Sequence, residues 1–241
     1  MKITWHKKIA EYFGYEFVRI SHKTFQDVNI HLMQLFNLLD INCVLDVGAN
    51  MGQYSQALRK AGYQGKIISF EPITECYQFL VNQKDENWHI MNIALGSSAG
   101  AIDLHVTNKN VFSSFLKPNQ YSVHRFNESA KTAHIETVEV KKLDDILAQI
   151  IPDLDSTNLF LKLDTQGYDL EVLKGAQQSL KYIAGIQSEI SCKAIYEGMP
   201  SHIESLTYID ELGYELTNIF PLSHDKHDLS LLECDCVFRK K

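Results

Sequence analysis

The residues with the clearest potential for chemistry stand at the ends of two apolar runs. Asp164 closes the run 158–164, and Lys162, two residues earlier, shares its face of an extended strand. Glu189 lies near the end of the run 185–191. A carboxylate placed here can take the proton of a hydroxyl nucleophile, and a lysine can hold a substrate oxygen or neutralise both acids. Asp164, Lys162 and Glu189 are therefore the candidate catalytic residues; turn capping by Asp164 and a structural ion pair for Lys162 are the alternatives.

A glycine turn follows an earlier apolar run, residues 43–48. Gly48 and Gly52 let the backbone turn tightly and approach a ligand, and a helix begins at about Gln53. In an open α/β sheet, ligands bind outside such a strand end. A dinucleotide fingerprint needs three glycines, but Asn50 and Gln53 occupy the second and third places. The turn therefore argues against NAD.

The remaining positions suit an adenosine-sized ligand that carries a positive charge. Glu71, after the second strand, can accept hydrogen bonds from both hydroxyls of a ribose. Asp46 can face a ligand ammonium directly or through water, and Asn92 can contact an adenine edge. This combination describes S-adenosylmethionine, whose predicted site comprises Asp46, Gly48, Asn50, Gly52, Tyr54, Glu71, Pro72, Asn92 and Ala94. The structural alternatives are loop support by Asp46, helix-terminus stabilisation by Glu71 and a simple turn at Asn92.

The acceptor side is predicted from loop composition. The polar stretch 107–132 is either a substrate lid or a solvated loop. Polar and aromatic side chains that would suit a sugar are Ser113, Ser114, His124, Arg125 and Tyr196. Asp164 is not followed by the Pro-Pro-aromatic sequence typical of methyl transfer to planar nitrogen, which favours an oxygen acceptor. A divalent metal held by Asp164, Glu189 and Asp235 is the less favoured alternative, because no compact acidic motif is present.

These residues require a sheet to position them. The apolar runs 43–48, 66–70, 88–93, 158–164 and 185–191 alternate with helical stretches, which predicts parallel strands joined by right-handed crossovers. Residues 102–106 and 135–140 alternate as antiparallel strands, and 214–219 and 231–238 close the sheet. An aspartate is expected to cap the helix that begins at about residue 143. Residues 1–40 are expected to form a helical cap, and 41–241 the rest of a single domain.

Composition narrows the class of protein. A chain of 241 residues, 45% hydrophobic and 22% charged, fits one α/β domain with decorations. The net charge of −7 argues against a general nucleic-acid partner, and no apolar run approaches membrane-spanning length. The N-terminus lacks the apolar core of a signal peptide, and five cysteines do not make a disulfide framework. We therefore expect a cytoplasmic enzyme that acts on a small molecule or a glycan. The sequence does not indicate an oligomeric state.

Several of these motifs together resemble a known family. They are 46–52 (DVGANMG), 70–72 (FEP), 94–96 (ALG), 161–167 (LKLDTQG) and 169–176 (DLEVLKGA). In order and spacing they are similar to the FkbM family of S-adenosylmethionine-dependent methyltransferases, over about residues 43–191. The resemblance implies a class I methyltransferase fold, Rossmann-like, with a seven-stranded mostly parallel sheet, helices on both faces and an antiparallel last strand. It also implies methylation of hydroxyls on sugars, glycolipids or polyketides.

One departure from the family pattern bears on the chemistry. Members commonly have Val-Glu-Gly after the fourth-strand aspartate, whereas this chain has Thr165, Gln166 and Gly167. The leading hypothesis is an O-methyltransferase of a carbohydrate, such as a nucleotide-linked sugar or a surface-glycan precursor. The alternative acceptor is the hydroxyl of a polyketide or other secondary metabolite. An NAD-dependent sugar dehydrogenase or epimerase is disfavoured by the missing glycines and by the lack of a Tyr-x-x-x-Lys pair; a non-enzymatic binding module is disfavoured by the intact acids.

Overall fold

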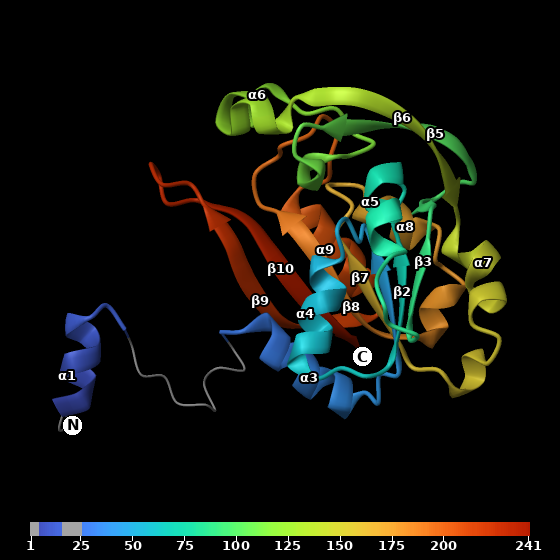
Figure 1. Ribbon diagram of the computed structural model, residues 1–241, viewed down its shortest axis with the longest axis horizontal. Helices are drawn as coiled ribbons and strands as arrows, with labels where there is room; N and C mark the ends of the chain where they lie inside the picture. Colours follow the sequence, from blue (N-terminus) through green and yellow to red (C-terminus); the bar gives the residue numbers. More distant parts are fainter. Residues whose placement is uncertain (1–4, 16–25) are drawn as a thin grey trace.

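The computed structural model describes residues 5–15 and 26–241 and has a seven-stranded sheet at its centre (Figure 1). The strand order is β3-β2-β1-β7-β8-β10-β9, and β10 alone runs against the others. This confirms the predicted mostly parallel sheet with an antiparallel last strand. The strands are β1 (Cys43–Val47), β2 (Lys66–Phe70), β3 (Trp88–Met91), β7 (Leu159–Leu163), β8 (Ile183–Ser191), β9 (Tyr214–His224) and β10 (Leu231–Lys240).

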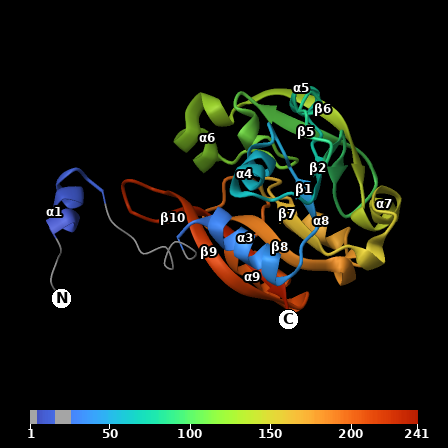
Figure 2. The ribbon, with the colours of Figure 1, turned by 60° about the horizontal axis from the view of Figure 1, so that its bottom comes forward.

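Helices cover both faces of this sheet because its central strands are apolar on both sides. Val44 packs with α3, α4 and α5, whereas its neighbour Leu45 packs with α7, α8 and α9. Figure 2 shows α3 beside α4 on one face. The helices are α3 (Val28–Leu38), α4 (Gln53–Ala61), α5 (Thr74–Leu80), α7 (Leu143–Ile150), α8 (Asp169–Lys174) and α9 (His202–Glu211), with short 3-10 helices η3 (Leu154–Ser156) and η4 (Ser179–Tyr182).

The N-terminal part of the chain contains α1 (Trp5–Tyr12) before α3. Asp27 caps α3, since its side chain accepts hydrogen bonds from two backbone N–H groups of the first turn. The apolar face of α3, including Leu32 and Phe36, is buried against the sheet. Residues 1–4 and 16–25 of the expected cap lie outside the described residues. The helical cap over residues 1–40 therefore stays a prediction.

A second, three-stranded sheet lies beside the carboxyl ends of the main one (Figure 1). Two of its strands pair antiparallel over 102–106 and 135–140, as the alternation predicts. The expected third parallel strand, 88–93, is two residues too long, since the observed strand ends at Met91; Ala94 and Leu95 then pair within the second sheet. The elements are β4 (Ala94–Leu95), β5 (Gly100–Thr107), β6 (Thr132–Lys141), and between the last two η1 (Asn110–Phe112), α6 (Gln120–Phe126) and η2 (Asn127–Ala130).

The predicted aspartate cap of α7 is wrong. Lys142 occupies the cap position and makes no side-chain cap bond. Asp144, one residue inside the helix, instead accepts hydrogen bonds from the backbone and hydroxyl of Ser179 at 2.8 and 2.7 Å. A tertiary contact with η4 has replaced the local one, and it fixes α7 against the segment that enters β8.

The strand order places a switch point beside β1. The chain builds outward from β1 to β2 and β3, and later returns on its other side with β7 and β8. Ligands of open α/β sheets bind outside the carboxyl ends at such a point. In the register of this pair, Asp46 on β1 is the partner of Lys162 on β7. The sheet topology therefore joins the two halves of the predicted site.

Candidate active site

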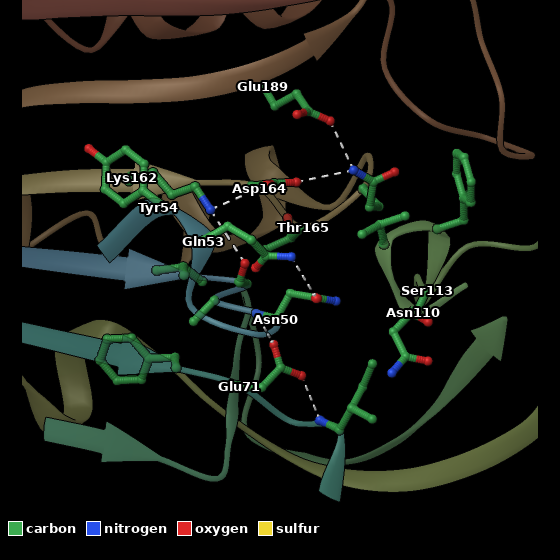
Figure 3. A pocket seen from close by; sticks show the side chains of 18 of the residues that line it. Asn50, Gln53, Tyr54, Glu71, Asn110, Ser113, Lys162, Asp164, Thr165 and Glu189 are labelled. Atoms are coloured by element: carbon green, nitrogen blue, oxygen red, sulfur yellow. Dashed lines mark hydrogen bonds and ion pairs between the residues drawn. The ribbon is translucent and has the colours of Figure 1, made fainter. Parts of the chain in front are cut away.

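A cavity of about 490 Å³ opens at the carboxyl ends of β1, β2, β7 and β8 (Figure 3). Its volume lies within the range of small-molecule sites. The segment 110–115 and residues of β10 complete its wall. Ten of the predicted site residues line it: Gly48, Asn50, Tyr54, Glu71, Pro72, Ala94, Ser113, Lys162, Asp164 and Glu189.

The glycine turn brings β1 against the end of β7. Gly48 has a φ of +77°, and a Cβ there would stand 2.0 Å from the carbonyl oxygen of Asp164. Only glycine therefore permits this close approach. Gly52, also at positive φ, begins α4, but a Cβ there would meet Trp88 and Leu80 in the core. Gly52 shapes the turn without lining the cavity.

Glu71 is anchored at the end of β2 by two backbone groups. Its Oε2 accepts from the N–H of Asn50 at 2.6 Å, and its Oε1 accepts from the N–H of Ile73 at 2.8 Å (Figure 3). Burial raises the pKa of Glu71 to about 7, although the two N–H donors oppose the rise. Each oxygen keeps a second lone pair, so this carboxylate can still accept a hydrogen bond from a ligand.

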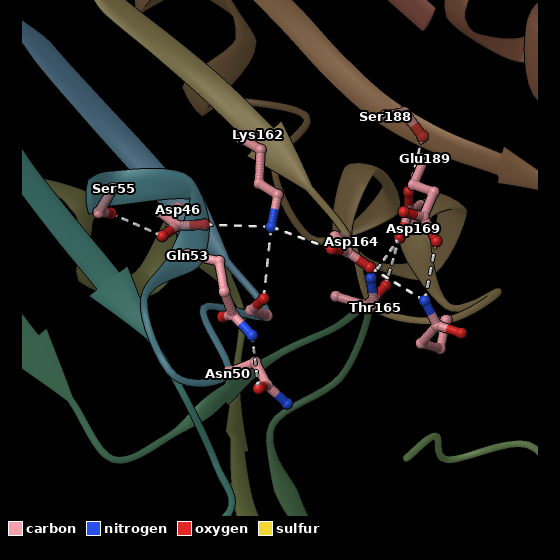
Figure 4. A network of polar contacts seen from close by, with 12 residues as sticks. Asp46, Asn50, Gln53, Ser55, Lys162, Asp164, Thr165, Asp169, Ser188 and Glu189 are labelled. Atoms are coloured by element: carbon pink, nitrogen blue, oxygen red, sulfur yellow. Dashed lines mark hydrogen bonds and ion pairs between the residues drawn. The ribbon is translucent and has the colours of Figure 1, made fainter. Parts of the chain in front are cut away.

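Lys162 sits under the turn in a buried ion network (Figure 4). Its ammonium lies 3.2 Å from Oδ1 of Asp46 and 3.3 Å from Oδ2 of Asp164, and it donates to the carbonyl oxygen of Gly48 at 3.3 Å. Burial alone would lower the pKa of Lys162, but the charges of Asp164 and Asp46 outweigh it and hold that pKa above its usual value. Lys162 therefore remains a cation and holds Asp164 in place.

The amide of Gln166 connects the two predicted catalytic acids. Its Nε2 donates to Oδ1 of Asp164 at 3.1 Å and to Oε1 of Glu189 at 2.9 Å. The Tyr196 hydroxyl lies 2.9 Å from Oε1 of the same amide, and Ser114 donates to the Gln166 carbonyl at 2.8 Å. This network fixes which way the amide points, so the amide N–H groups face the acids.

Several predicted ligand contacts do not line the cavity. Asp46 is fully buried, and its Oδ2 accepts from Ser55 at 2.8 Å while Lys162 faces its other oxygen. In this arrangement both oxygens of Asp46 face protein groups, and the contact of Asp46 with a ligand ammonium stays a prediction. Asn92 turns away from the cavity, since its amide donates to the carbonyl oxygens of Glu71 and Pro72 at 2.9 and 3.0 Å. Its amide nitrogen thus supports the end of β2, and the adenine contact stays a prediction.

Four of the five predicted acceptor contacts also lie outside the cavity wall. Ser114 and Tyr196 are buried beneath it and orient Gln166, as described above. His124 and Arg125 belong to α6, where the Arg125 Nε lies 3.8 Å from Asp225 on the neighbouring loop. Only Ser113 reaches the wall. Loop composition does not indicate which polar residues face the cavity, so the acceptor contacts stay predictions.

Other lining residues were not predicted. They include Gln53, Asn110, Phe112, Phe115, Thr165, Gln166, Gln187, Leu222, Ser223 and Glu233, together with Asp235, which the sequence suggests only as a metal ligand. Strand alternation carried a usable signal for two of them. Gln187 stands two residues before Glu189, and Glu233 two residues before Asp235, so each shares the face of its neighbour.

Two further features concern metal binding and membrane insertion. No group of three or more His, Cys, Asp and Glu side chains among them is arranged to hold a metal ion. None of the helices in the described ranges is long and apolar enough to cross a membrane.

Comparisons with known proteins agree with the motif pattern. The chain is 30% identical over 171 residues to Methyltransferase sdnD of Sordaria araneosa, covering 61% of this chain and 65% of that protein. It is 28% identical over 152 residues to Methyltransferase 1 of Beauveria bassiana (strain ARSEF 2860), covering 56% and 59%. The chain thus spans less than two thirds of the length of these relatives.

Solved structures of methyltransferases are similar at lower identity. One is the methyltransferase FkbM from Methylobacillus flagellatus KT, at 19% identity and a TM-score of 0.48, covering 83% of this chain and 44% of that one. Another is the magnesium protoporphyrin IX methyltransferase from Synechocystis PCC 6803, at 9% identity and a TM-score of 0.48, covering 99% and 92%. The sequence model of the Methyltransferase FkbM domain matches residues 46–216, and the chain therefore belongs to the FkbM methyltransferase family.

Proposed function

We propose that this chain is an S-adenosylmethionine-dependent O-methyltransferase that acts on a hydroxyl group of a carbohydrate. The observation that carries the proposal is the placement of Asp164. Its carboxylate lines the cavity, with a side chain 30% exposed, while Lys162 and Gln166 hold it from two sides. A carboxylate fixed in this way is suited to take a proton from a bound hydroxyl.

The cavity fits the cofactor on its β1–β2 side. Glu71 presents an anchored carboxylate with free lone pairs, which matches the hydroxyls of a ribose. Ile73, Ala94 and Leu95 add an apolar wall beside it, which suits the flat face of an adenine. When bound there, S-adenosylmethionine would supply a methyl group activated by its sulfonium. The buried Asp46 fixes Lys162.

Two residues at the end of β7 divide the work of proton transfer and positioning. Asp164 accepts the proton of the acceptor hydroxyl as the new O–CH3 bond forms. Lys162 cannot serve as the base, because the acids around it keep it protonated. Its charge instead offsets the negative charge of Asp46 and Asp164 beneath the turn. Holding the hydroxyl in line with the methyl group contributes roughly 7–11 kcal/mol, and a general base about 10²–10⁴-fold.

The acceptor class rests on the polar half of the cavity, where carboxylates and amides prevail. Such groups suit a molecule with many hydroxyls. A hydroxyl of a polyketide or other secondary metabolite remains the second candidate, because both curated relatives are fungal methyltransferases. We further propose that the protein works in the cytoplasm.

Two measurements test the proposal in sequence. Calorimetry with S-adenosylhomocysteine and with NAD should show binding of the first only; the reverse would point to the dehydrogenase alternative. Mass spectrometry of nucleotide sugars and of hydroxylated polyketides, each incubated with enzyme and S-adenosylmethionine, should then show a methyl-sized gain in a sugar. A gain only in polyketides would transfer the assignment to the second candidate. Loss of the gain in Asp164→Asn ties the reaction to this site.

A further inference from the structure

One wall of the cavity carries acids that the proposed methyl transfer does not use. Glu189 on β8 and Asp235 on β10 are direct partners in the antiparallel register. Strand alternation adds Gln187 two residues before Glu189, and Glu233 two residues before Asp235, on the same side. All four line the cavity, and we call them the β8–β10 cluster.

Like charges directly opposite one another destabilise an antiparallel pair. Among the described residues that line the cavity, no cation forms an ion pair with these acids, although the charge of Lys162 opposes the rise in the pKa of Glu189 and Asp235. Lys162 is the single cation there, and its ammonium already faces Asp46, Asp164 and the Gly48 carbonyl oxygen. The nearest groups that help the cluster are neutral. Gln166 donates to Glu189 at 2.9 Å, and Ser223 donates to Glu233 at 3.0 Å.

The pKa values of Glu189 and Asp235 are both raised, as expected for buried acids without an ion-pair partner. Burial, followed by the charges of Asp164, Glu233 and Asp235, raises the pKa of Glu189 well above its usual value. Burial and the charge of Asp164 also raise the pKa of Asp235, although a hydrogen bond from Gln187 opposes the rise. These buried acids therefore take up a proton more readily than exposed carboxylates do.

Gln187 provides a second and independent observation. Its side chain is 3% exposed and lines the cavity, yet its Oε1 has no hydrogen-bond partner among the described residues. A buried carbonyl oxygen without a donor costs about 1–3 kcal/mol, so its retention in the wall calls for a ligand that donates. The amide nitrogen of the same side chain faces Asp235. An acceptor oxygen and three carboxylates thus converge, and none of them offers an N–H or O–H when ionised.

We infer that the β8–β10 cluster binds the protonated amine of the acceptor, and that the acceptor is an amino sugar. This inference rests on the proposed function and names its substrate class. An ammonium supplies three N–H donors, which suit Gln187 Oε1 and the carboxylates of Glu233 and Asp235. The same contact keeps the amine protonated, and an ammonium has no lone pair with which to attack a methyl group. The transfer is therefore directed to a hydroxyl near Asp164, whose proton passes to that carboxylate.

Binding measurements test this inference without relying on turnover. The protein is first loaded with S-adenosylhomocysteine, and saturation-transfer NMR then measures amino sugars with the amine at each ring position. Each is paired with its N-acetyl derivative, which has the same ring but no charge. At least one amino sugar should bind about tenfold more tightly than its partner. If none does while S-adenosylhomocysteine binds, the inference is overturned and the proposed function stands; if S-adenosylhomocysteine itself does not bind, the proposed function fails.

Two variants test whether the β8–β10 cluster causes the tighter binding of the amino sugar. Glu233→Gln and Asp235→Asn keep the side-chain shape, and each should reduce the preference for the amine about tenfold. Binding of the N-acetyl derivative and of S-adenosylhomocysteine should stay unchanged, which also shows that each variant folds. The matched control is Glu139→Gln on the exposed side of β6, which should leave the preference intact.

Three results would overturn the inference. If both variants weaken S-adenosylhomocysteine as much as the amino sugar, the cluster serves the cofactor's own ammonium. If the preference for the amine appears only with added Mg²⁺ and disappears with a chelator, the cluster holds a metal ion instead. An unchanged preference in both variants would place the amine elsewhere.

Discussion

The two sides of the cavity are built in different ways. On the β1–β2 side, the polar groups come from two short stretches of chain, 46–54 and 70–73, and backbone N–H groups hold the key acid, Glu71. On the β7–β8–β10 side, Asp164, Glu189 and Asp235 come from three strands and are held by other side chains. The first side is a local motif, whereas the second exists only after the sheet has formed.

This difference has a functional meaning. Under the proposed function, the β1–β2 side holds the cofactor and the β7–β8–β10 side holds the acceptor, so the first needs a fixed local frame and the second needs side chains that can vary. The Thr165–Gly167 segment belongs to the second side, and it is there that this chain departs from the usual Val-Glu-Gly pattern. If the two sides act separately, a substitution on one side should change the binding or turnover that depends on that side and leave the other side's function intact.

The largest effect is expected from Asp164→Asn. The amide keeps the shape of the carboxylate but cannot take a proton, so kcat should fall about 10²–10⁴-fold. Affinity for S-adenosylhomocysteine should stay within about threefold, since Glu71 and the turn are untouched. Steady-state kinetics and calorimetry measure the two quantities. An equal loss of both would mean that the two sides are not separable at this residue.

Lys162→Met should lower the free energy of unfolding, because Lys162 forms ion pairs with Asp46 on one side of the cavity and Asp164 on the other. It removes the ammonium that lies between two carboxylates and leaves Asp46, which is fully buried, without its counter-charge. Breaking a buried pair in this way costs about 3–5 kcal/mol of the free energy of unfolding. Urea denaturation measures the change. The exposed Lys174→Met on α8 is the control and should change stability by less than about 0.5 kcal/mol.

Glu71→Gln should affect the cofactor side alone. The variant loses a charged acceptor, so S-adenosylhomocysteine should bind about 10–100-fold more weakly, in line with a hydrogen bond to a charged group. The KM of the acceptor, measured at saturating cofactor, should change little. Glu75→Gln, on the exposed first turn of α5, is the matched control and should bind normally. Normal binding by Glu71→Gln itself would remove its proposed ribose contact.

The raised pKa of Glu71 predicts a pH dependence for the same contact. Because this pKa is about 7, the free protein takes up a proton on the carboxylate as the pH falls through that value. A ligand that binds the ionised form must then displace the proton, so affinity should decrease below pH 7, by at most about tenfold per pH unit. Calorimetry across this range measures it. A wild-type profile as flat as that of Glu71→Gln would assign the contact to another group.

The smallest effect is expected from Gln166→Ala. It removes the amide that orients Asp164 and Glu189 but leaves both acids and Lys162 in place. The loss of about one net hydrogen bond, near 1 kcal/mol, corresponds to roughly a fivefold lower kcat. The Gln166→Asn variant, with a shorter side chain, should behave in the same way because it cannot span both acids. A loss as large as that of Asp164→Asn would give Gln166 a direct role in the chemistry.

The sequence by itself determined the sheet class, the strand limits of β1, β2 and β7, and the family. It could do so because a buried parallel strand needs a continuous apolar run, and because the turn after β1 needs glycine at positive φ. It also placed Glu71 in the cavity wall, since that residue directly follows a predicted strand. These features depend on neighbours in the chain, whose spacing the sequence displays.

Only the tertiary structure decided which way polar side chains face. Asp46 turns to Lys162 because the parallel register makes them partners, and Asn92 turns back to the end of β2. Glu233 enters the cavity because β10 pairs antiparallel with β8. These outcomes depend on contacts between residues that are distant in the chain, where burial requires each polar group to find a partner. The positions of such partners are set by the packing of the strands, which no local pattern contains.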